Sequence, residues 1–431
     1  MPERAVRRLG ENGQGEATPA VGPEYGYFPN ATLKVFLTDI CNLSCEGCFM
    51  ESSLQRLVKN SYNRLPNEKV MALMAEAKSA FGTEMVEFSG GEVTLELSDL
   101  KELVRVSKGM GFKTRIVTNG TILGREGTYN ENLTPYLPID LASVTPQDAV
   151  YELKQSGLDS VILSIDSMHN VRNKDLKPDR LSAKAPVSTL ANALRILLDA
   201  GYGADTGGGL RSDHSLRIGV TAAGSEYEES YLLVDQVFEE ANRGFRFLGK
   251  EGRYGVWLAS DGKKVYVHRN ETADVGFGQR LKDKQLVDIA DSVYDRSCYV
   301  FSARSIAAKG TGGVHQEICV FPDGVVSTCA YRSHVIGNHN KQSLTDIVRS
   351  VNDSSIKPLD EVELGVLVLR ELFKIAEEVG GRGVWGEAYR RVVKVNPDLK
   401  LGVESFKSHT AACGGLTKNR DFLDALIAYR N

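Results

Sequence analysis

Predicted strands and helices alternate along the first 250 residues of this 431-residue chain. Segments rich in β-branched and aromatic residues predict strands, and stretches with helical periodicity between them predict helices. The predicted strands cover 31–40, 84–89, 113–120, 159–166, 215–222 and 244–249, and the predicted helices cover 67–81, 98–110, 148–156, 188–200 and 229–242. This alternation indicates an α/β fold with a parallel sheet covered by helices, and its six or so repeats are fewer than the eight of a closed barrel.

The alternation of predicted strands and helices ends at about residue 250, and hairpin patterns follow it. Residues 256–269 and 316–331 each have the pattern of a β-hairpin, and the second is expected to turn at Asp323–Gly324. Helical patterns follow at 361–378, at 384–394 and after Cys413. The second part of the chain is therefore expected to combine hairpins with helices.

These patterns predict three regions. Residues 1–28 are polar and Gly-rich and predict a flexible leader. Residues 29–250 predict a partial (β/α)6, TIM-like barrel with ligand sites at the carboxyl ends of its strands, and residues 251–431 predict a second region. Irregular stretches at 124–147 and 250–282 are expected to shape a substrate pocket.

Charge and hydropathy exclude several classes of protein. Net charge is −4 and no long basic run occurs, which argues against a dedicated nucleic-acid surface. No run of eighteen apolar residues is present, and the N-terminus lacks the apolar core of a secretory signal. We therefore expect a cytoplasmic protein, in a reducing compartment where seven cysteines are better read as metal ligands than as disulfides.

Three of the seven cysteines lie within eight residues, directly after the first predicted strand. Cys41, Cys45 and Cys48 have the spacing C-x3-C-x2-C in the stretch LTDICNLSCEGCFM. Three thiolates in one loop suit an iron–sulfur cluster and leave one iron of a four-iron cubane open to an external ligand. The alternatives are a zinc site with a distant fourth ligand, or cysteines that are merely buried.

This cysteine pattern at the end of a first strand resembles the signature of radical S-adenosylmethionine (SAM) enzymes. The resemblance implies that the open iron of a [4Fe-4S] cluster binds the methionine part of SAM, and that SAM is cleaved to a 5′-deoxyadenosyl radical that abstracts hydrogen from a substrate. The family usually has an aromatic residue just before the third cysteine. Here that position is Gly47 and Phe49 follows the cysteine instead, so Phe49 is the expected cofactor contact.

Two later segments resemble family motifs that surround SAM. Gly90, Gly91 and Glu92 end the second predicted strand and resemble the GGE segment, which holds the SAM amino group. Adjacent glycines let a backbone approach closely, and a carboxylate can accept a hydrogen bond from an ammonium group. Asn119 lies in a Thr-Asn-Gly segment at the end of the third strand, and it resembles the TNG segment beside the SAM pocket.

The fourth strand ends in SIDSMHN, which extends the resemblance. Ser164 and Asp166 match the Ser-x-Asp pair that contacts the SAM carboxylate and ribose in relatives. Arg172 is the expected carboxylate-binding arginine, with Arg180 as the alternative. His169 is the weak candidate for a catalytic residue.

The four remaining cysteines are Cys298, Cys319, Cys329 and Cys413, the number that a fully ligated second cubane requires. Residues 317–347 resemble the SPASM/twitch extension of radical SAM enzymes, which uses a hairpin and a G-x4-C spacing. The full SPASM pattern supplies seven cysteines for two clusters, so the resemblance implies one auxiliary [4Fe-4S] cluster in a C-terminal hairpin and helical domain. The alternative is that some of the four are free core thiols.

The resemblance implies an enzyme that acts on a small natural-product precursor, such as a sugar or an aminocyclitol, by oxidation or epimerisation. One alternative is an enzyme that crosslinks or epimerises a residue of a ribosomal peptide, and another is a non-catalytic iron–sulfur or zinc protein. About thirty polar residues precede the first strand, too few for the winged-helix module that peptide-modifying relatives often carry. An external reductant such as flavodoxin or ferredoxin is also expected.

Overall fold

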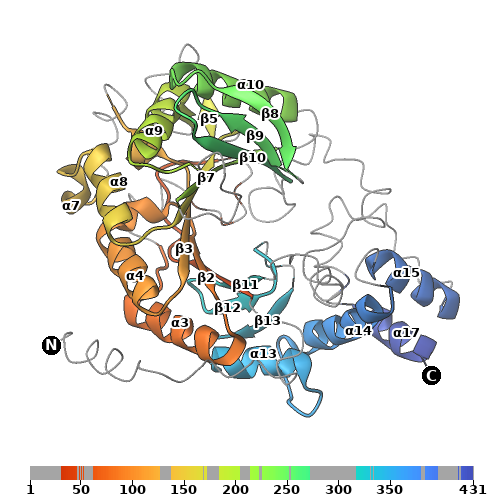
Figure 1. Cartoon of the computed structure of the whole chain (residues 1–431). Helices are drawn as coiled ribbons and strands as arrows, with labels where there is room; N and C mark the ends of the chain where they lie inside the picture. The colour runs from red at the N-terminus through yellow and green to blue at the C-terminus, as the bar shows by residue number, and fades with distance from the viewer. Residues whose placement is uncertain are drawn as a thin grey trace.

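The computed structural model describes the elements of the fold in the ranges that follow (Figure 1). They are 31–45, 48, 50, 52, 62–126, 137–167, 169–171, 184–203, 214–222, 226–251, 254–271, 317–330, 332, 334–379, 384–396, 416 and 419–430. Within these ranges the chain forms an α/β structure, as the alternation of strands and helices predicts.

One large sheet organises the molecule. Its parallel strands are β1 (Thr32–Phe36), β2 (Met85–Ser89), β3 (Lys113–Thr118), β4 (Ser160–Ser164), β7 (Ser215–Ala222) and β10 (Lys264–Glu271), which neighbour one another in this order. Each of these pairs is parallel. Six parallel strands in chain order are consistent with the predicted partial barrel.

The sixth of these strands is not the one that the sequence predicts. The 244–249 segment falls largely in β8 (Arg246–Glu251), which pairs antiparallel with β9 (Tyr254–Leu258) at the edge of the sheet. The gap between β8 and β9 is too short for the crossover that a parallel pair requires, so the chain turns back as a hairpin. β9 then pairs antiparallel with β10, which confirms the 256–269 hairpin.

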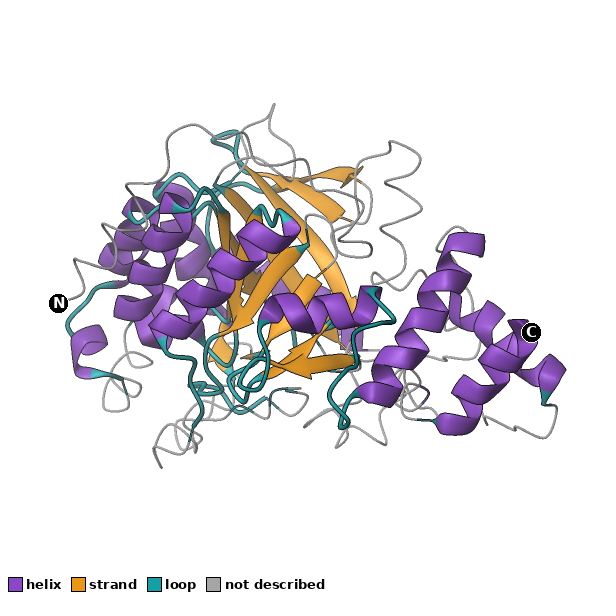
Figure 2. Cartoon of the chain, turned by 90° about the horizontal axis from the view of Figure 1, so that it is seen from below, coloured by secondary structure: helices purple, strands orange, loops and turns teal. Residues whose placement is uncertain are grey.

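Helices cover the outer face of the curved sheet (Figures 1 and 2). They are α3 (Asn67–Phe81), α4 (Leu97–Gly109), α8 (Pro146–Gln155), α9 (Val187–Asp199) and α10 (Glu226–Glu240). Shorter elements join them: η2 (Val93–Glu96), α5 (Thr121–Gly124), α7 (Ile139–Ala142), β5 (Asn170–Val171) and β6 (Ala185–Pro186). Alternate residues of the strands, such as Leu33, Val86, Ile116, Val161 and Leu216, are fully buried in one core with these helices.

The second predicted hairpin extends the same sheet. β11 (Glu317–Val320) pairs antiparallel with β12 (Val325–Ser327), and β12 pairs with β13 (Val335–Asn338). β11 also pairs in parallel with β1, placing Glu317 opposite Thr32. A segment almost 290 residues downstream thus lies beside the strand that leads into the cysteine loop.

The chain ends in helices. These are α13 (Leu344–Asn352), α14 (Glu363–Val379), α15 (Val384–Val395) and α17 (Arg420–Arg430), and the last three stand beside the sheet in Figure 2. Across the described ranges, no helix has both the length and the apolar character needed to cross a bilayer.

The inner face of the sheet carries a ladder of charged side chains. Lys34 Nζ lies 2.7 Å from Glu87 Oε1, and Arg115 Nη1 lies 3.1 Å from Glu87 Oε2. Lys34 also lies 3.9 Å from Glu317, and Arg115 Nε donates to Ser160 Oγ over 3.2 Å. Burial by itself raises the pKa of Glu87, but Lys34 and Arg115 outweigh it and lower the pKa to about 2. Glu87 therefore links three neighbouring strands as a buried anion.

Replacing Glu87 with glutamine is expected to reduce the free energy of unfolding at pH 7 by about 3 kcal/mol, because two buried cations lose their partner. The pKa of Glu87 in the fold lies below its ordinary value of 4.5. The stabilisation is therefore complete above pH 5 and disappears as the pH falls toward 2.

Urea unfolding of wild type and Glu87→Gln at pH 7 and pH 4 measures this difference. Glu317→Gln is the matched control, because Glu317 is 36 % exposed in its side chain and its loss should cost less than about 1 kcal/mol. A Glu87→Gln effect that is independent of pH contradicts the assignment.

Candidate functional site

The cysteine loop begins where β1 ends and lies along the carboxyl end of β2. Leu37 N donates to Ser89 O over 2.8 Å, Gly91 N to Thr38 O over 2.8 Å and Glu92 N to Ile40 O over 2.7 Å. These bonds continue the β1–β2 pairing past the ends of both strands. The residues before Cys41 are therefore held by backbone contacts to the Gly-Gly-Glu segment.

Close backbone packing explains why this segment contains two glycines. A Cβ at Gly91 would lie 1.7 Å from Ile40 O, and a Cβ at Gly90 would lie 2.4 Å from Thr38 O. Gly90 also has φ +143°, a backbone conformation that other residues rarely adopt. Both glycines thus bring β2 into contact with the cysteine loop itself, and their contact with SAM stays a prediction.

Glu92 joins the ends of β2 and β3 from a fully buried position. Its Oε1 accepts from Thr94 N over 3.0 Å, from Thr94 Oγ1 and from Thr118 Oγ1 over 2.7 Å, and its Oε2 accepts from Asn119 N over 2.7 Å. Burial raises the pKa of Glu92, and the bonds from Thr94, Thr118 and Asn119 oppose that rise. The carboxylate therefore fixes the position of the Asn119 backbone.

Replacing Glu92 with glutamine is expected to cost about 2 kcal/mol of unfolding free energy. The amide group of glutamine cannot accept on both sides, so either Asn119 N–H or the donors from Thr94 and Thr118 lose their acceptor. Chemical denaturation of the variant tests this expectation. Thr94→Val, which removes one of the bonds and keeps the carboxylate, should cost about 1 kcal/mol; equal stability of Glu92→Gln and wild type would contradict the assignment.

Asn119 directs its side chain at the start of the cysteine loop. Its Nδ2 lies 3.6 Å from Cys41 Sγ and donates to Asn42 Oδ1 over 3.1 Å. Asn42 Nδ2 in turn donates to Thr121 Oγ1 over 2.8 Å, and Thr121 Oγ1 donates to Asn119 Oδ1 over 2.6 Å. This closed network ties the Thr-Asn-Gly segment to Cys41.

The three thiols of the loop are buried or half-buried, and hydrogen-bond donors approach Cys41. Cys41 and Cys45 are each 7 % exposed, and Cys48 is half-buried. Leu43 N lies 3.4 Å from Cys41 Sγ, and the backbone of Ser52 and of Met50 opposes the rise in the pKa of the Cys48 thiol. Burial and the neighbouring Cys45 raise the pKa of the Cys41 and Cys48 thiols when no metal is bound. A positive metal centre would overcome this cost of forming thiolates.

The three thiols and their surroundings fit an iron–sulfur cluster. Thiolate sulfurs with N–H donors directed at them are the usual surroundings of such clusters. In the described part of the chain, no three histidine, cysteine or acidic side chains form a group that could hold a metal ion. A cubane differs from a single ion because it spreads its thiolates over separate corners. Cys41, Cys45 and Cys48 are therefore the residues that would hold it.

The end of β4 brings Asp166 and His169 to the same site. Asp166 is fully buried, and its Oδ1 lies 2.7 Å from His169 Nδ1 and accepts from His169 N over 3.0 Å. Burial lowers the pKa of His169, but Asp166 and the nearby Cys45 outweigh it and raise the pKa. Ser164 is half-buried at the last position of β4. Their contacts with SAM stay predictions, and Gly47, Phe49, Arg172 and Arg180 lie outside the described residues.

Two of the other four cysteines lie on the second hairpin. Cys319 is fully buried in a small apolar cluster with Phe36, Met50 and Phe321, and Cys48 packs against that cluster. Cys329 is half-buried and close enough that its charge raises the pKa of Cys319, after burial and Glu317. Cys298 and Cys413 lie outside the described residues. The auxiliary cluster therefore stays a prediction.

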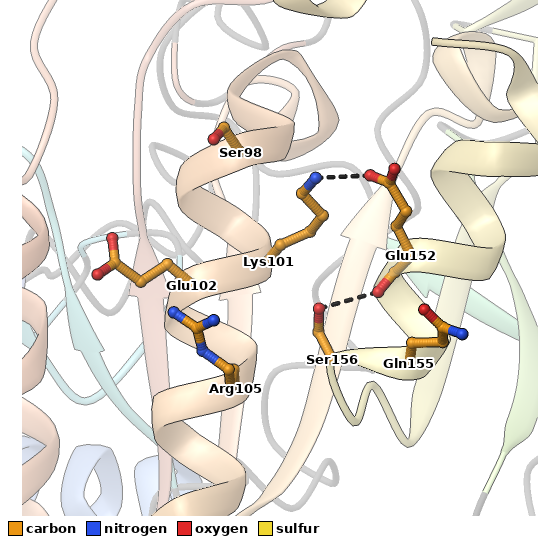
Figure 3. A pocket seen from close by; sticks show the side chains of 7 residues that line it. All are labelled: Ser98, Lys101, Glu102, Arg105, Glu152, Gln155 and Ser156. Carbon is orange, nitrogen blue, oxygen red and sulfur yellow. Dashed lines mark hydrogen bonds and ion pairs between the residues drawn. The ribbon is translucent and has the colours of Figure 1, made fainter.

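A groove of about 550 Å³ lies between helices α4 and α8, on the outer surface. Figure 3 shows Lys101 of α4 paired with Glu152 of α8, and Ser98, Glu102, Arg105, Gln155 and Ser156 around them. None of the predicted site residues lines this groove. It therefore takes no part in the site at the cysteine loop.

Sequence reasoning missed several polar residues near the site. Asn42 and Thr121 support Cys41, yet a single Asn or Thr in a loop has no distinctive spacing. Lys34, Glu87 and Arg115 could have been found, because each interrupts the apolar pattern of a strand that is otherwise buried.

Comparison with known proteins agrees with this geometry. The family model described as Radical SAM superfamily matches residues 35–211. The chain is 28% identical over 141 residues to "Probable GTP 3',8-cyclase" of Saccharolobus islandicus (strain M.14.25 / Kamchatka #1), covering 32% of this chain and 36% of that protein. It is 29% identical over 171 residues to the protein of the same name from Sulfurisphaera tokodaii, covering 39% and 52%.

The chain thus spans between a third and about half of the length of these curated relatives. A comparison with solved structures finds "Crystal structure of BtrN in complex with AdoMet and 2-DOIA", with 13% sequence identity and a TM-score of 0.33. The alignment covers 83% of this chain and 89% of that structure.

Proposed function

We propose that this chain, whose residues 35–211 match the Radical SAM superfamily model, oxidises or epimerises a small-molecule precursor after reductive cleavage of SAM. When bound, the cluster and SAM supply an electron and a 5′-deoxyadenosyl radical that abstracts hydrogen from the substrate. The chain itself would hold the thiols, orient the cluster and SAM, and exclude water from the site.

One observation carries the proposal. The cysteine loop is tied to the carboxyl ends of β2 and β3 by Gly91, Glu92 and Asn119, and His169, just after β4, lies near enough to Cys45 to have its pKa raised by it. The three thiols and the motifs expected around SAM therefore meet at one edge of the sheet. Ligands of open parallel sheets bind at this edge.

The proposed substrate is a sugar-like or aminocyclitol-like molecule. The inner face of the sheet supports a polar substrate, because it carries Lys34, Glu87, Arg115 and Ser160 in contact with one another. The names of the curated relatives give a nucleotide, GTP, as what those proteins act on, which is also a small polar molecule. Cys319 and Cys329, close together on the hairpin, support an auxiliary cluster that would accept the second electron of an oxidation.

Anaerobic reconstitution with iron and sulfide, followed by SAM and dithionite, tests the proposal. We expect 5′-deoxyadenosine, and deuterium transfer into it from a perdeuterated sugar or aminocyclitol. Flavodoxin or ferredoxin should replace dithionite as the reductant. The proposal fails if a loaded cluster gives no 5′-deoxyadenosine. Deuterium transfer only from a peptide would instead assign a peptide as the substrate.

A further inference from the structure

The inner face of β7 and β10 carries polar side chains that the site at the cysteine loop does not use. Every second residue of these strands is apolar and packs in the core shared with the helices: Leu216, Ile218, Val220, Val265 and Val267. Because successive residues of a strand point to opposite faces, Arg217 of β7 and His268 of β10 lie on the inner face. Both are buried, with 7 % and 8 % of their surface exposed.

Strand register places these residues level with the predicted cofactor site. Ser164, the last residue of β4, is the partner of Gly219 on β7, and Gly219 is the partner of His268 on β10. Arg217 lies two residues before Gly219 and therefore on the same face. The Cα atoms of His268 and Ser164, which is expected to contact SAM, are two strand spacings or about 10 Å apart, and the residue between them has no side chain.

Two tyrosines of the β9–β10 hairpin complete this group. Tyr254 of β9 is the cross-strand partner of His268, and the centres of their rings lie 5.5 Å apart. The guanidinium carbon of Arg217 lies 5.8 Å from the centre of the Tyr254 ring, and the Tyr266 ring meets Tyr254 edge-on at 6.3 Å. Three neighbouring strands thus bring a guanidinium, an imidazole and two phenol groups together.

We propose that Arg217, Tyr254 and His268 form a subsite that binds an acidic group of the substrate, a carboxylate or a phosphate ester. The inference rests on the proposed function, because it places the substrate beside the cofactors of that reaction. It narrows the substrate from a sugar or an aminocyclitol to a sugar-like molecule that carries a negative charge.

The chemistry of the three side chains favours an anion. A guanidinium is always charged, and its five N–H donors form a planar fork that matches the oxygens of a carboxylate or a phosphate. An imidazole N–H and a phenol O–H can donate to the same oxygens. Hydrogen bonds to a charged acceptor are stronger than neutral ones, and a buried site strengthens them further. The ammonium group of an aminocyclitol would instead be repelled by the guanidinium.

Isothermal titration of the anaerobically reconstituted protein, with SAM bound and no reductant, tests the inference. The probes share one ring and differ in charge: glucuronate, glucose 6-phosphate, glucose and glucosamine. We expect glucuronate or glucose 6-phosphate to bind at least about tenfold more tightly than glucose, as one hydrogen-bonded charge pair allows. The tighter of the two identifies the group as a carboxylate or a phosphate. Glucose or glucosamine bound as tightly as the better anionic sugar overturns the inference, and so does failure of both anionic sugars to bind.

Substitutions in the subsite give a second readout. Arg217→Met should abolish the preference for the anionic sugar and leave glucose binding within about twofold of wild type. His268→Leu should reduce the preference about threefold, and His268→Gln, which keeps an N–H donor, should reduce it less. Arg105→Met, at an exposed position of α4, is the matched control and should keep the preference.

A preference that survives in Arg217→Met, or that Arg105→Met loses to the same extent, overturns the inference. The comparison of the four sugars needs only wild type, so it decides the inference even if Arg217→Met does not fold.

Formation of 5′-deoxyadenosine by the same protein separates this inference from the proposed function. If the proposed function is wrong, the loaded wild type forms none, whichever sugar it binds. If only the inference is wrong, the loaded protein forms 5′-deoxyadenosine and takes deuterium from a neutral sugar or an aminocyclitol, while the titration shows no preference for an anionic sugar.

Discussion

Replacing Cys41, Cys45 and Cys48 together with alanine should lower iron from about eight to about four atoms per chain, since each cubane holds four. Formation of 5′-deoxyadenosine from SAM should disappear altogether, because no cluster with an open iron remains. The thiols of Cys41 and Cys45 are buried, and Cys41 receives hydrogen-bond donors from Leu43 N and Asn119. Iron and acid-labile sulfide analysis after anaerobic reconstitution provides the measurement, together with chromatographic assay of 5′-deoxyadenosine.

The paired variant Cys319→Ala/Cys329→Ala is the matched control for this experiment. Those two cysteines lie on the β11–β12 hairpin, so their loss should remove the other half of the iron and leave 5′-deoxyadenosine formation intact. A wild type that saturates near four irons contradicts the auxiliary cluster. A triple variant that still cleaves SAM contradicts the assignment of the three thiols.

Replacing Gly91 with alanine should have the second large effect. The added Cβ would lie 1.7 Å from Ile40 O and 3.0 Å from Ser52 Oγ, so the backbone on both sides of the cysteine loop must move apart. We expect a loss of at least about 3 kcal/mol of unfolding free energy and most of the iron bound by the three thiols. Denaturant unfolding and iron analysis measure the two effects.

Gly109→Ala is the control for the Gly91 substitution. A Cβ at Gly109 meets no atom within 4 Å, and alanine at the end of α4 should stabilise the helix by about 0.5 kcal/mol. Gly91→Ala with the iron content and stability of Gly109→Ala would show that the close approach to the cysteine loop is not required.

The main elements of the barrel could be predicted from local patterns. The strands before residue 223 and the five helices around them lie where the alternation of apolar and polar residues places them. The pattern did not show that β10, and not β8, is the sixth parallel strand, because local sequence does not say which strand pairs with β7. β8 and β9 pair antiparallel because the gap between them is too short for a crossover.

The pairing of β11 with β1 could not be predicted from local sequence either. The sequence of β11 does not indicate that this strand lies beside β1, because the contact joins two segments almost 290 residues apart. The motif residues at the ends of the strands could be located, yet their contacts could not. Glu92, expected to bind SAM, binds Thr94, Thr118 and Asn119 in the structure, and only coordinates reveal such partners.

The central claim is that three thiols leave one iron of the cluster open for SAM. Electron–nuclear double resonance of the reduced wild-type protein, with SAM labelled with 15N and 17O in its amino and carboxylate groups, tests it most directly. The account predicts that both labels couple to the cluster. Absence of either coupling, in protein whose cluster is loaded and whose SAM is bound, would contradict it.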